Sequence, residues 1–257
     1  MSLKKIFMTL TLFVASTSCA SGQAGYYRVW QGFQKPDMTT EAFQQRLPWF
    51  MNETRSIYTG VLNNYLVAIP PAVKPAFIPD EFALVALNSE QDYQNVRATD
   101  AGKAYGQAHW QVFNQENSKS AAYTSQIPDR LQHNQAYDVM GTPIDWNSGT
   151  TTFFIGLKKD SITADAYMTW LSRHIKEVAE GLKPYGLKGY VIIANDQYEV
   201  AFMNWESTEA RNAAFASPVG LHVRSESETY MSLLMFQEAQ VFDKNSVTSD
   251  RLYNTGL

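Results

Sequence analysis

The chain has 257 residues, of which 45% are apolar, 13% aromatic and 18% charged. This length and apolar content fit one large or two smaller globular domains and exclude a disordered chain. The single cysteine excludes a disulfide within one chain and a cysteine-based metal site, and we expect no metal. The net charge of -4 counts against a nucleic-acid partner, which needs a basic surface.

The first residues have the pattern of an export signal. Lys4 and Lys5 precede an apolar run over 6–14, and small residues follow over 15–20. The run is too short to span a bilayer as an ordinary membrane helix. We therefore expect residues 1–18 to be a signal peptide and the protein to be exported.

The position of the cysteine leaves two routes for signal cleavage. Cleavage before Cys19 would resemble the processing of a bacterial lipoprotein, with Cys19 lipidated and the protein anchored at a periplasmic or outer-membrane surface. Cleavage after Ala20 or Ala24 would instead give a free periplasmic or secreted protein. In either case, we expect membrane contact only through a lipid anchor at Cys19.

Two stretches of the chain repeat each other at an offset of 124 residues. Residues 39–47 (TTEAFQQRL) match residues 163–171 (TADAYMTWL). Each stretch predicts a helix that begins after a threonine N-cap, Thr39 or Thr163, and that carries an acidic residue in its first turn. We expect Pro48 to kink the first of these helices.

Apolar strand patterns follow the repeated helices in each half. The first half has strands expected at 65–69 and 82–87, joined by a proline-rich loop over 70–79, and the second half has them at 189–194, 198–203 and 231–236. A second helical region matches between the halves, because Ser89 and Gly102 recur as Ser207 and Gly220. We expect the last strand of the first half at 136–140, after an inserted helical stretch near 104–124.

The expected order of elements is therefore β-α-β-β-α-β, twice, which is the ferredoxin-like unit. With segments such as 204–210 (NWESTEA) and 217–220 (SPVG), the chain resembles the tandem dimeric α/β-barrel superfamily, which includes antibiotic-biosynthesis monooxygenase-like, NIPSNAP-like and chlorite-dismutase-like proteins. The resemblance implies an α+β fold in which two ferredoxin-like repeats pack sheet to sheet as an intrachain barrel. We expect the repeats at 26–145 and 150–243, followed by a tail over 244–257.

Sequence motifs do not identify a reaction. The nucleophile elbow, the Walker loop and the zinc-protease pattern are all absent from the sequence. The resemblance to cofactor-independent monooxygenases implies a pocket built from strand residues, for which the candidates are Trp30, Tyr190, Asn204 and Trp205, with core packing as the alternative role.

Two histidines are further candidates for ligand binding. His174 lies beside the apolar stripe of the second-half helix, as a ligand contact or as a satisfied core residue. The haem-binding members of the superfamily imply an axial histidine on a helix, a role open to His222, which is otherwise a surface or capping residue. The cofactor is therefore unknown, with haem as one alternative.

Three functions are compatible with these observations. The leading interpretation is an exported cell-envelope protein that binds a small apolar or aromatic ligand in a pocket between sheet and helices. The alternatives are a cofactor-independent or haem-dependent monooxygenase, and a structural or interaction protein with a filled barrel. The expected partner is a small molecule, and self-association into a homo-oligomer is left open.

Overall fold

The computed structural model describes residues 23–141, 143–238 and 240–241. The predicted signal peptide, the lipidation candidate Cys19 and the whole predicted tail lie outside these residues. In the described part of the chain, no helix has the length and apolar character needed to span a membrane.

The first half of the fold is a four-stranded antiparallel sheet with helices on one face. Its strands lie in the order β2-β3-β1-β4, the ferredoxin-like arrangement. In chain order, the elements are β1 (Tyr26–Gly32), α1 (Thr40–Ile57), β2 (Leu62–Ala68), β3 (Glu81–Leu87), α2 (Glu90–Ala98), α3 (Asp100–Ala108), the 3-10 helix η1 (His109–Gln111) and β4 (Lys119–Thr124).

The second half repeats this arrangement, with strands in the order β7-β8-β6-β9. Its elements are β6 (Thr150–Lys158), α4 (Ala164–Leu182), the 3-10 helix η2 (Lys183–Tyr185), β7 (Leu187–Ala194), β8 (Tyr198–Trp205), α5 (Thr208–Ala216), α6 (Pro218–Tyr230) and β9 (Met231–Glu238). The two ferredoxin-like repeats expected from the sequence are therefore present.

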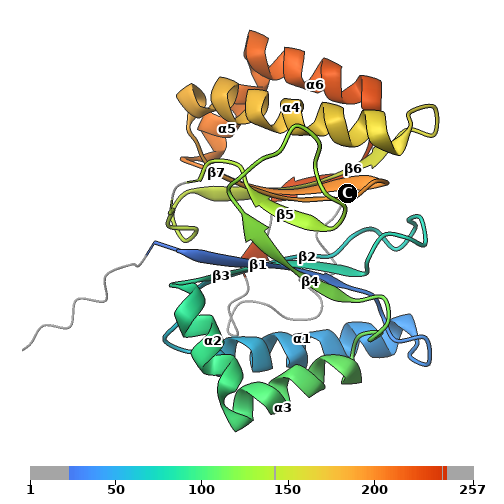
Figure 1. Cartoon of the computed structure of the whole chain (residues 1–257), viewed down its shortest axis with the longest axis vertical. Coiled ribbons are helices and arrows are strands. Elements are labelled where there is room, and N and C mark those ends of the chain that lie inside the picture. Colours follow the sequence, from blue (N-terminus) through green and yellow to red (C-terminus); the bar gives the residue numbers. More distant parts are fainter. Residues whose placement is uncertain (1–22, 142, 239, 242–257) are drawn as a thin grey trace, which may run out of the picture.

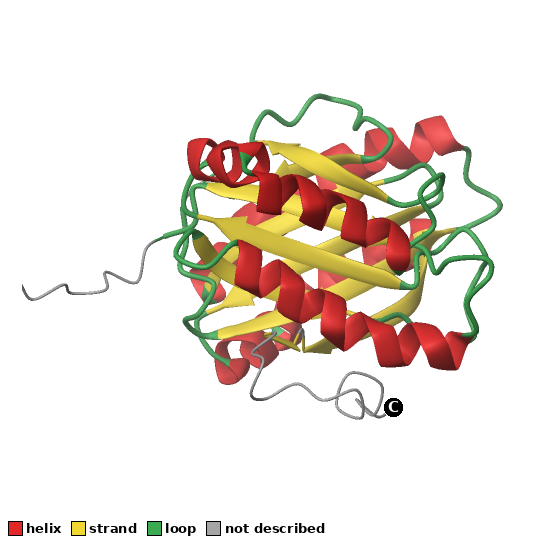
Figure 2. Ribbon diagram, turned by 90° about the horizontal axis from the view of Figure 1, so that it is seen from below, coloured by secondary structure: helices red, strands yellow, loops and turns green. Residues whose placement is uncertain are grey.

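Two short strands join the halves into one barrel. β5 (Gln135–Asp138) pairs parallel with β4 and antiparallel with β7. At the other edge, β10 (Gln240–Val241) pairs with β2, and it follows β9, which pairs with β6, after a single residue. β10 and β9 therefore lie at the two ends of the spatial strand order and are consecutive in the chain, so the sheet closes on itself. Figure 1 shows the two sheets face to face, with one layer of helices outside each, and Figure 2 shows the strands passing behind the outer helices.

Side chains from both halves fill the interior of the barrel. Tyr27 and Leu84 of the first half share one buried cluster with Phe153 and Val200 of the second. Ile78, from the proline-rich loop, joins the same cluster. Two further clusters lie between each sheet and its own helices. One face of each sheet therefore packs against the other sheet inside the barrel, and the other face packs against the helices.

The repeated helices begin as the sequence predicts. The Thr39 hydroxyl accepts a hydrogen bond from the Ala42 amide, and the Thr163 hydroxyl accepts one from the Ala166 amide, which satisfies an amide that the helix itself cannot. α1 runs from Thr40 to Ile57 with Pro48, where we expect a kink, inside the helix.

The prediction for the last strand of the first half was wrong. The segment expected at 136–140 forms β5, which bridges the halves, and β4 takes the edge position beside β1. The reason is that 119–124, placed by the sequence reading in an inserted helical stretch, forms the strand instead. Its polar, partly exposed pattern hides it from a search for apolar strands.

Candidate functional site

A cavity of about 460 Å³ lies between the sheet and the helices of the first half. On the side of the sheet it is lined by residues from β1, β2, β3 and β4, and on the other side by residues from α1, α2, α3 and η1. We call it the first-half pocket, and its principal lining residues are Arg28, Trp30, Phe50, Thr54, Tyr58, Tyr65, Ala83, Tyr93, Arg97, Tyr105, Gly106, His109 and Trp110. This volume lies within the range of small-molecule sites, roughly 300–1,000 Å³.

Aromatic rings enclose the deeper part of this pocket. Phe50 stacks on Tyr105 with ring centroids 5.5 Å apart, and Trp30 meets His109 edge to face at 4.9 Å. Among these walls, the Tyr105 hydroxyl lies 2.7 Å from Thr54 Oγ1. Because Thr54 Oγ1 itself donates to the Phe50 carbonyl, the Tyr105 hydroxyl is the donor of this pair. The lining is therefore suited to a flat, largely apolar ligand.

His109 is a neutral imidazole in the wall of the pocket. Burial lowers its pKa to about 4, against a smaller raising effect of the Tyr105 carbonyl. Its Nδ1 lies 3.0 Å from that carbonyl oxygen, which can only accept, so Nδ1 carries the proton. The other ring nitrogen, Nε2, keeps its lone pair and has no protein partner among the described residues.

Glu81 is fully buried on the helix-facing side of β3. Neither of its carboxylate oxygens makes a hydrogen bond within the described part of the chain. Burial raises the pKa of Glu81 to about 8, and the nearby Trp30 indole N–H lowers it only in part. The carboxyl group is therefore largely protonated at neutral pH and adds little negative charge to this side of the sheet.

The mouth of the pocket is basic. Arg28, Arg97, Lys103 and Lys119 all line it. Lys103 pairs with Asp100 at 3.3 Å, whereas Arg28 and Arg97 have no carboxylate partner within 4 Å in the described ranges. Although the net charge of the chain is negative, the surface beside this aromatic cavity is locally positive.

Large side chains fill the corresponding space in the second half. An offset of 118 residues aligns β3, α2 and α3 with β8, α5 and α6, so that Leu87 corresponds to Trp205 and Arg97 to Phe215. The Trp205 and Phe215 rings pack together with centroids 5.4 Å apart. The two halves have the same fold, but their helix-facing spaces differ in these residues.

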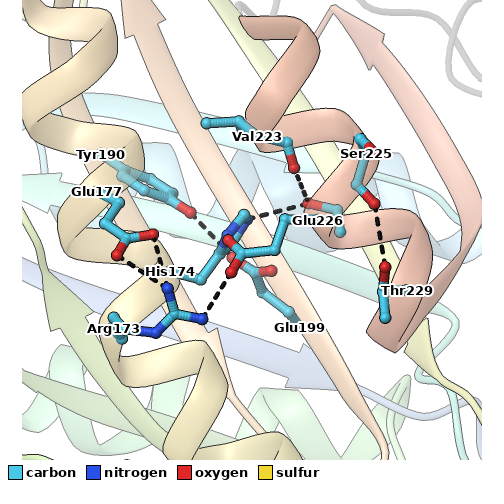
Figure 3. A network of polar contacts seen from close by, with 10 residues as sticks. Arg173, His174, Glu177, Tyr190, Glu199, Val223, Ser225, Glu226 and Thr229 are labelled. Carbon is cyan, nitrogen blue, oxygen red and sulfur yellow. Dashed lines mark hydrogen bonds and ion pairs between the residues drawn. The ribbon is translucent and has the colours of Figure 1, made fainter. Parts of the chain in front are cut away.

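The candidates predicted from the sequence do not form one site. Trp30 lines the first-half pocket, whereas Tyr190 and His174 belong to the second half. Tyr190 donates to Glu199 Oε1 at 3.0 Å, and both residues are buried. Figure 3 shows this contact beside the His174 network that joins α4 to α6.

His174 has partners on both ring nitrogens. Nδ1 lies 2.8 Å from Glu226 Oε2, and Nε2 lies 3.0 Å from Ser227 Oγ. Burial lowers the pKa of His174, against the raising effect of Glu226, and Nδ1 donates a hydrogen bond to the Glu226 carboxylate. The Ser227 hydroxyl, which contacts Nε2, also donates to the Val223 carbonyl. His174 is the satisfied histidine that the sequence reading kept as an alternative to a ligand contact.

Asn204 and Trp205 lie on opposite faces of β8, because neighbouring side chains on a strand alternate. Asn204 donates to Thr151 Oγ1 at 3.1 Å, and the Trp205 indole donates to Thr152 Oγ1 at 3.0 Å. These two residues cannot line one pocket together, and Trp205 packs in the helix-facing core.

The structure does not support the haem assignment to His222. His222 is exposed on α6, and both ring nitrogens of His174 already have protein partners. Neither residue therefore fits the role of an axial ligand, and we assign no chemistry through haem.

Three ligand atoms of His174, Glu177 and Glu226 lie within 4.8 Å of one another, a spacing that a metal ion could use. Arg173 already binds both carboxylates, with Nη1 2.9 Å from Glu177 and Nη2 2.6 Å from Glu226. The guanidinium supplies the positive charge that a cation would bring. We interpret this cluster as a set of ion pairs that holds α4 and α6 together.

Sequence reasoning missed His109, Arg97 and Glu81. His109 lay in a stretch assigned to an insertion, so it was not connected to the repeat. Glu81 could have been found, because it recurs as Glu199 at the same 118-residue offset that relates Ser89 to Ser207. A carboxylate repeated within two apolar strands indicates a buried ionisable group.

No protein-family model matches the chain, and no curated protein is significantly similar to it. Solved structures with a similar arrangement include a candidate monooxygenase from Fusobacterium nucleatum, at 13% identity and a TM-score of 0.48, over 86% of this chain and 94% of that one. A haem-binding protein from Thermus thermophilus gives 13% and 0.37 over 87% and 93%, and a chlorite dismutase variant from Candidatus Nitrospira defluvii gives 11% and 0.39 over 90% and 97%. These proteins belong to the dimeric α/β-barrel superfamily. At this level of similarity, none of them informs the chemistry of this chain.

Proposed function

We propose that the protein binds a small aromatic molecule in the first-half pocket. The observation that carries this proposal is the difference between the halves: the first half retains a cavity enclosed by Trp30, Phe50 and Tyr105, whereas Trp205 and Phe215 pack into the equivalent region of the second. Flat apolar rings gain both burial and stacking contacts in such a cavity.

Equilibrium dialysis with neutral one-, two- and three-ring aromatic amides tests the proposal without relying on charge. We expect at least one of them, such as 2-naphthamide, to bind with a stoichiometry of one molecule per protein chain. The pocket-filling variant Gly106→Phe should abolish this binding. Gly106 is helical, and an added Cβ would meet only the Arg97 side chain, at 3.4 Å, so the variant should fold.

Ala104→Phe is the matched control, because it adds the same side chain to an exposed position of the same helix, α3. It should leave binding unchanged. If no aromatic compound binds, neutral or charged, or if Gly106→Phe binds as well as the unchanged protein, the proposed function is wrong.

The second candidate function is a cofactor-independent oxygenase that uses the same pocket. The observation in its favour is the neutral His109 imidazole, whose free Nε2 could accept a proton from a bound hydroxy-aromatic compound. Against it stands the pKa of about 4, which makes this imidazole a weak base at neutral pH. Binding is therefore the better-supported function.

Oxygen uptake separates the two candidates. With 1,4-dihydroxynaphthalene, ligand binding without turnover predicts no uptake above the rate of the buffer alone. Faster uptake that His109→Phe removes would establish the oxygenase instead.

We further propose that the protein is exported and anchored through Cys19. The basic Lys4 and Lys5, the apolar run over 6–14 and the small residues before the cysteine support this proposal. Mass spectrometry of the mature protein from a bacterial host tests it: a diacylglyceryl group on an N-terminal Cys19 is expected. An unmodified terminus at Ser21 or Gly25 would contradict the anchor.

A further inference from the structure

Two arginines meet at one side of the mouth of the first-half pocket. The Arg28 guanidinium lies over the Tyr93 ring, 5.5 Å from its centroid. Arg97 follows Tyr93 by four residues on α2, which places it on the same face of that helix, one turn along. The two cationic groups therefore flank one aromatic ring of the pocket.

Both guanidinium groups also act on Tyr58, a buried residue of the same pocket. Burial raises the pKa of the Tyr58 hydroxyl, with Tyr93 adding to the rise, while the positive charges of Arg97 and Arg28 oppose it. The positive charges of both arginines therefore act on the same hydroxyl of the pocket.

Arg28 is held in this position by β4. Its Nε donates to Ser120 Oγ at 2.9 Å, and Nη2 donates to the Ser120 carbonyl, also at 2.9 Å. These contacts use only part of the five N–H groups of a guanidinium. The remaining donors are fixed in direction before any ligand arrives, which lowers the entropic cost of binding.

The acidic groups of this region are engaged elsewhere. Asp92 accepts a hydrogen bond from Ser89, and Asp100 pairs with Lys103. Glu81, on the helix-facing side of the sheet, makes no ion pair with either arginine. In the ranges that the structure describes, no carboxylate lies within 4 Å of Arg28 or Arg97.

We propose that the ligand of the first-half pocket is an aromatic carboxylate, with its rings among the aromatic walls and its carboxylate between Arg28 and Arg97. Guanidinium groups bind carboxylates through paired, charge-assisted hydrogen bonds, and an uncompensated pair of them supplies this recognition. This inference rests on the proposed function and adds the chemical class of the ligand.

The test compares 2-naphthoate with 2-naphthamide, which have nearly the same shape and differ in charge. The carboxylate should bind about tenfold or more tightly than the amide, as expected for charge-assisted hydrogen bonds. Raising the NaCl concentration from about 0.02 M to about 0.5 M should weaken the binding of the carboxylate but not that of the amide, because salt screens the charges of the arginines.

Arg97→Gln and Arg28→Gln should each reduce the preference for 2-naphthoate over 2-naphthamide by about tenfold. The control Arg224→Gln removes the same charge from an exposed site on α6, outside the pocket, and should change neither affinity. Arg97 is itself exposed, so its replacement should not disturb folding.

The outcomes distinguish this inference from the proposed function. If both compounds bind equally, or if Arg97→Gln and Arg28→Gln leave the preference for the carboxylate intact, the inference is wrong while the pocket remains a binding site. If neither compound binds the unchanged protein, the proposed function fails, and the inference fails with it.

Discussion

Glu81 and Glu199 occupy the same position in the two halves of the barrel, and of the two only Glu199 has a hydrogen-bond partner in the described chain. The Tyr190 hydroxyl donates to Glu199 at 3.0 Å, while both oxygens of Glu81 lack a partner. Burial raises the pKa of Glu199 to about 7 and that of Glu81 to about 8. The duplication has kept a buried carboxyl group in both halves and has left the one beside the pocket unsatisfied.

The raised pKa of Glu81 predicts a loss of stability at alkaline pH. The folded protein keeps the proton that the unfolded chain releases near pH 4.5, so its contribution is complete below that pH and is lost as the pH rises through about 8. The loss should be on the order of 4 kcal/mol. Urea unfolding between pH 5 and pH 9 should show Glu81→Gln to be more stable than the unchanged protein at pH 9. If both proteins lose the same unfolding free energy between pH 5 and pH 9, Glu81 is not a buried, protonated group. The control is Glu180→Gln, which changes an exposed residue of α4.

His109 has the opposite effect at acidic pH. Its pKa is lowered from 6.5 to about 4, so the unfolded chain takes up a proton that the folded protein does not. The stability that His109 contributes is complete above pH 6.5 and should fall by about 2–3 kcal/mol as the pH drops to 4. His109→Phe keeps the ring contacts and should flatten this fall, measured by urea unfolding. His222→Gln, at an exposed site, is the control for removing a histidine. A fall of unchanged steepness in His109→Phe would show that its imidazole is not desolvated.

Gly102 and Gly220 should be equally intolerant of a side chain. Each lies at the tight corner between two helices, where an added Cβ would come within 2.0 Å of the Val96 carbonyl or 2.2 Å of the Ala214 carbonyl. Backbone atoms cannot yield easily, so Gly102→Ala and Gly220→Ala should each cost about 1–3 kcal/mol of unfolding free energy. Gly106→Ala, on the same helix as Gly102, should instead be neutral or stabilising by up to about 1 kcal/mol. Equal thermal midpoints for all three variants would contradict the model of the corner.

Trp205→Leu tests whether packing closes the second half. Trp205 is fully buried, and its indole donates to Thr152 at 3.0 Å. Its counterpart in the first half is a leucine, Leu87. The variant should lose about 3–5 kcal/mol of unfolding free energy, because it leaves a cavity and an unpaired hydroxyl. A loss below about 1 kcal/mol would show that the second half can close around the smaller side chain.

The sequence was most informative where a local pattern is repeated. Thr39 and Thr163 each precede a helix with the same spacing of apolar residues, and both act as N-caps in the structure. The strand alternation around Asn204 and Trp205 likewise implies that these two side chains face opposite sides of the sheet, as they do in the structure.

The pocket could not be predicted in the same way. Arg97 lines it where Phe215 stands in the second half, and its lining comes from four strands and four helical segments. Contacts among segments so distant in the chain depend on tertiary packing. The local spacing of apolar residues does not predict such packing. The strand β4, which orients Arg28, is polar and therefore lacks the apolar alternation by which strands are predicted.

A crystal structure of the protein grown with 2-naphthoate tests the central claim most directly. We predict the naphthyl rings beside Trp30 and Tyr105, and the carboxylate within hydrogen-bonding distance of Arg28 and Arg97. A second cavity, of about 340 Å³, is lined in part by Phe77 and Tyr198. Density for the compound in that cavity, or in the second half, with the first-half pocket closed, would contradict the assignment of the ligand site.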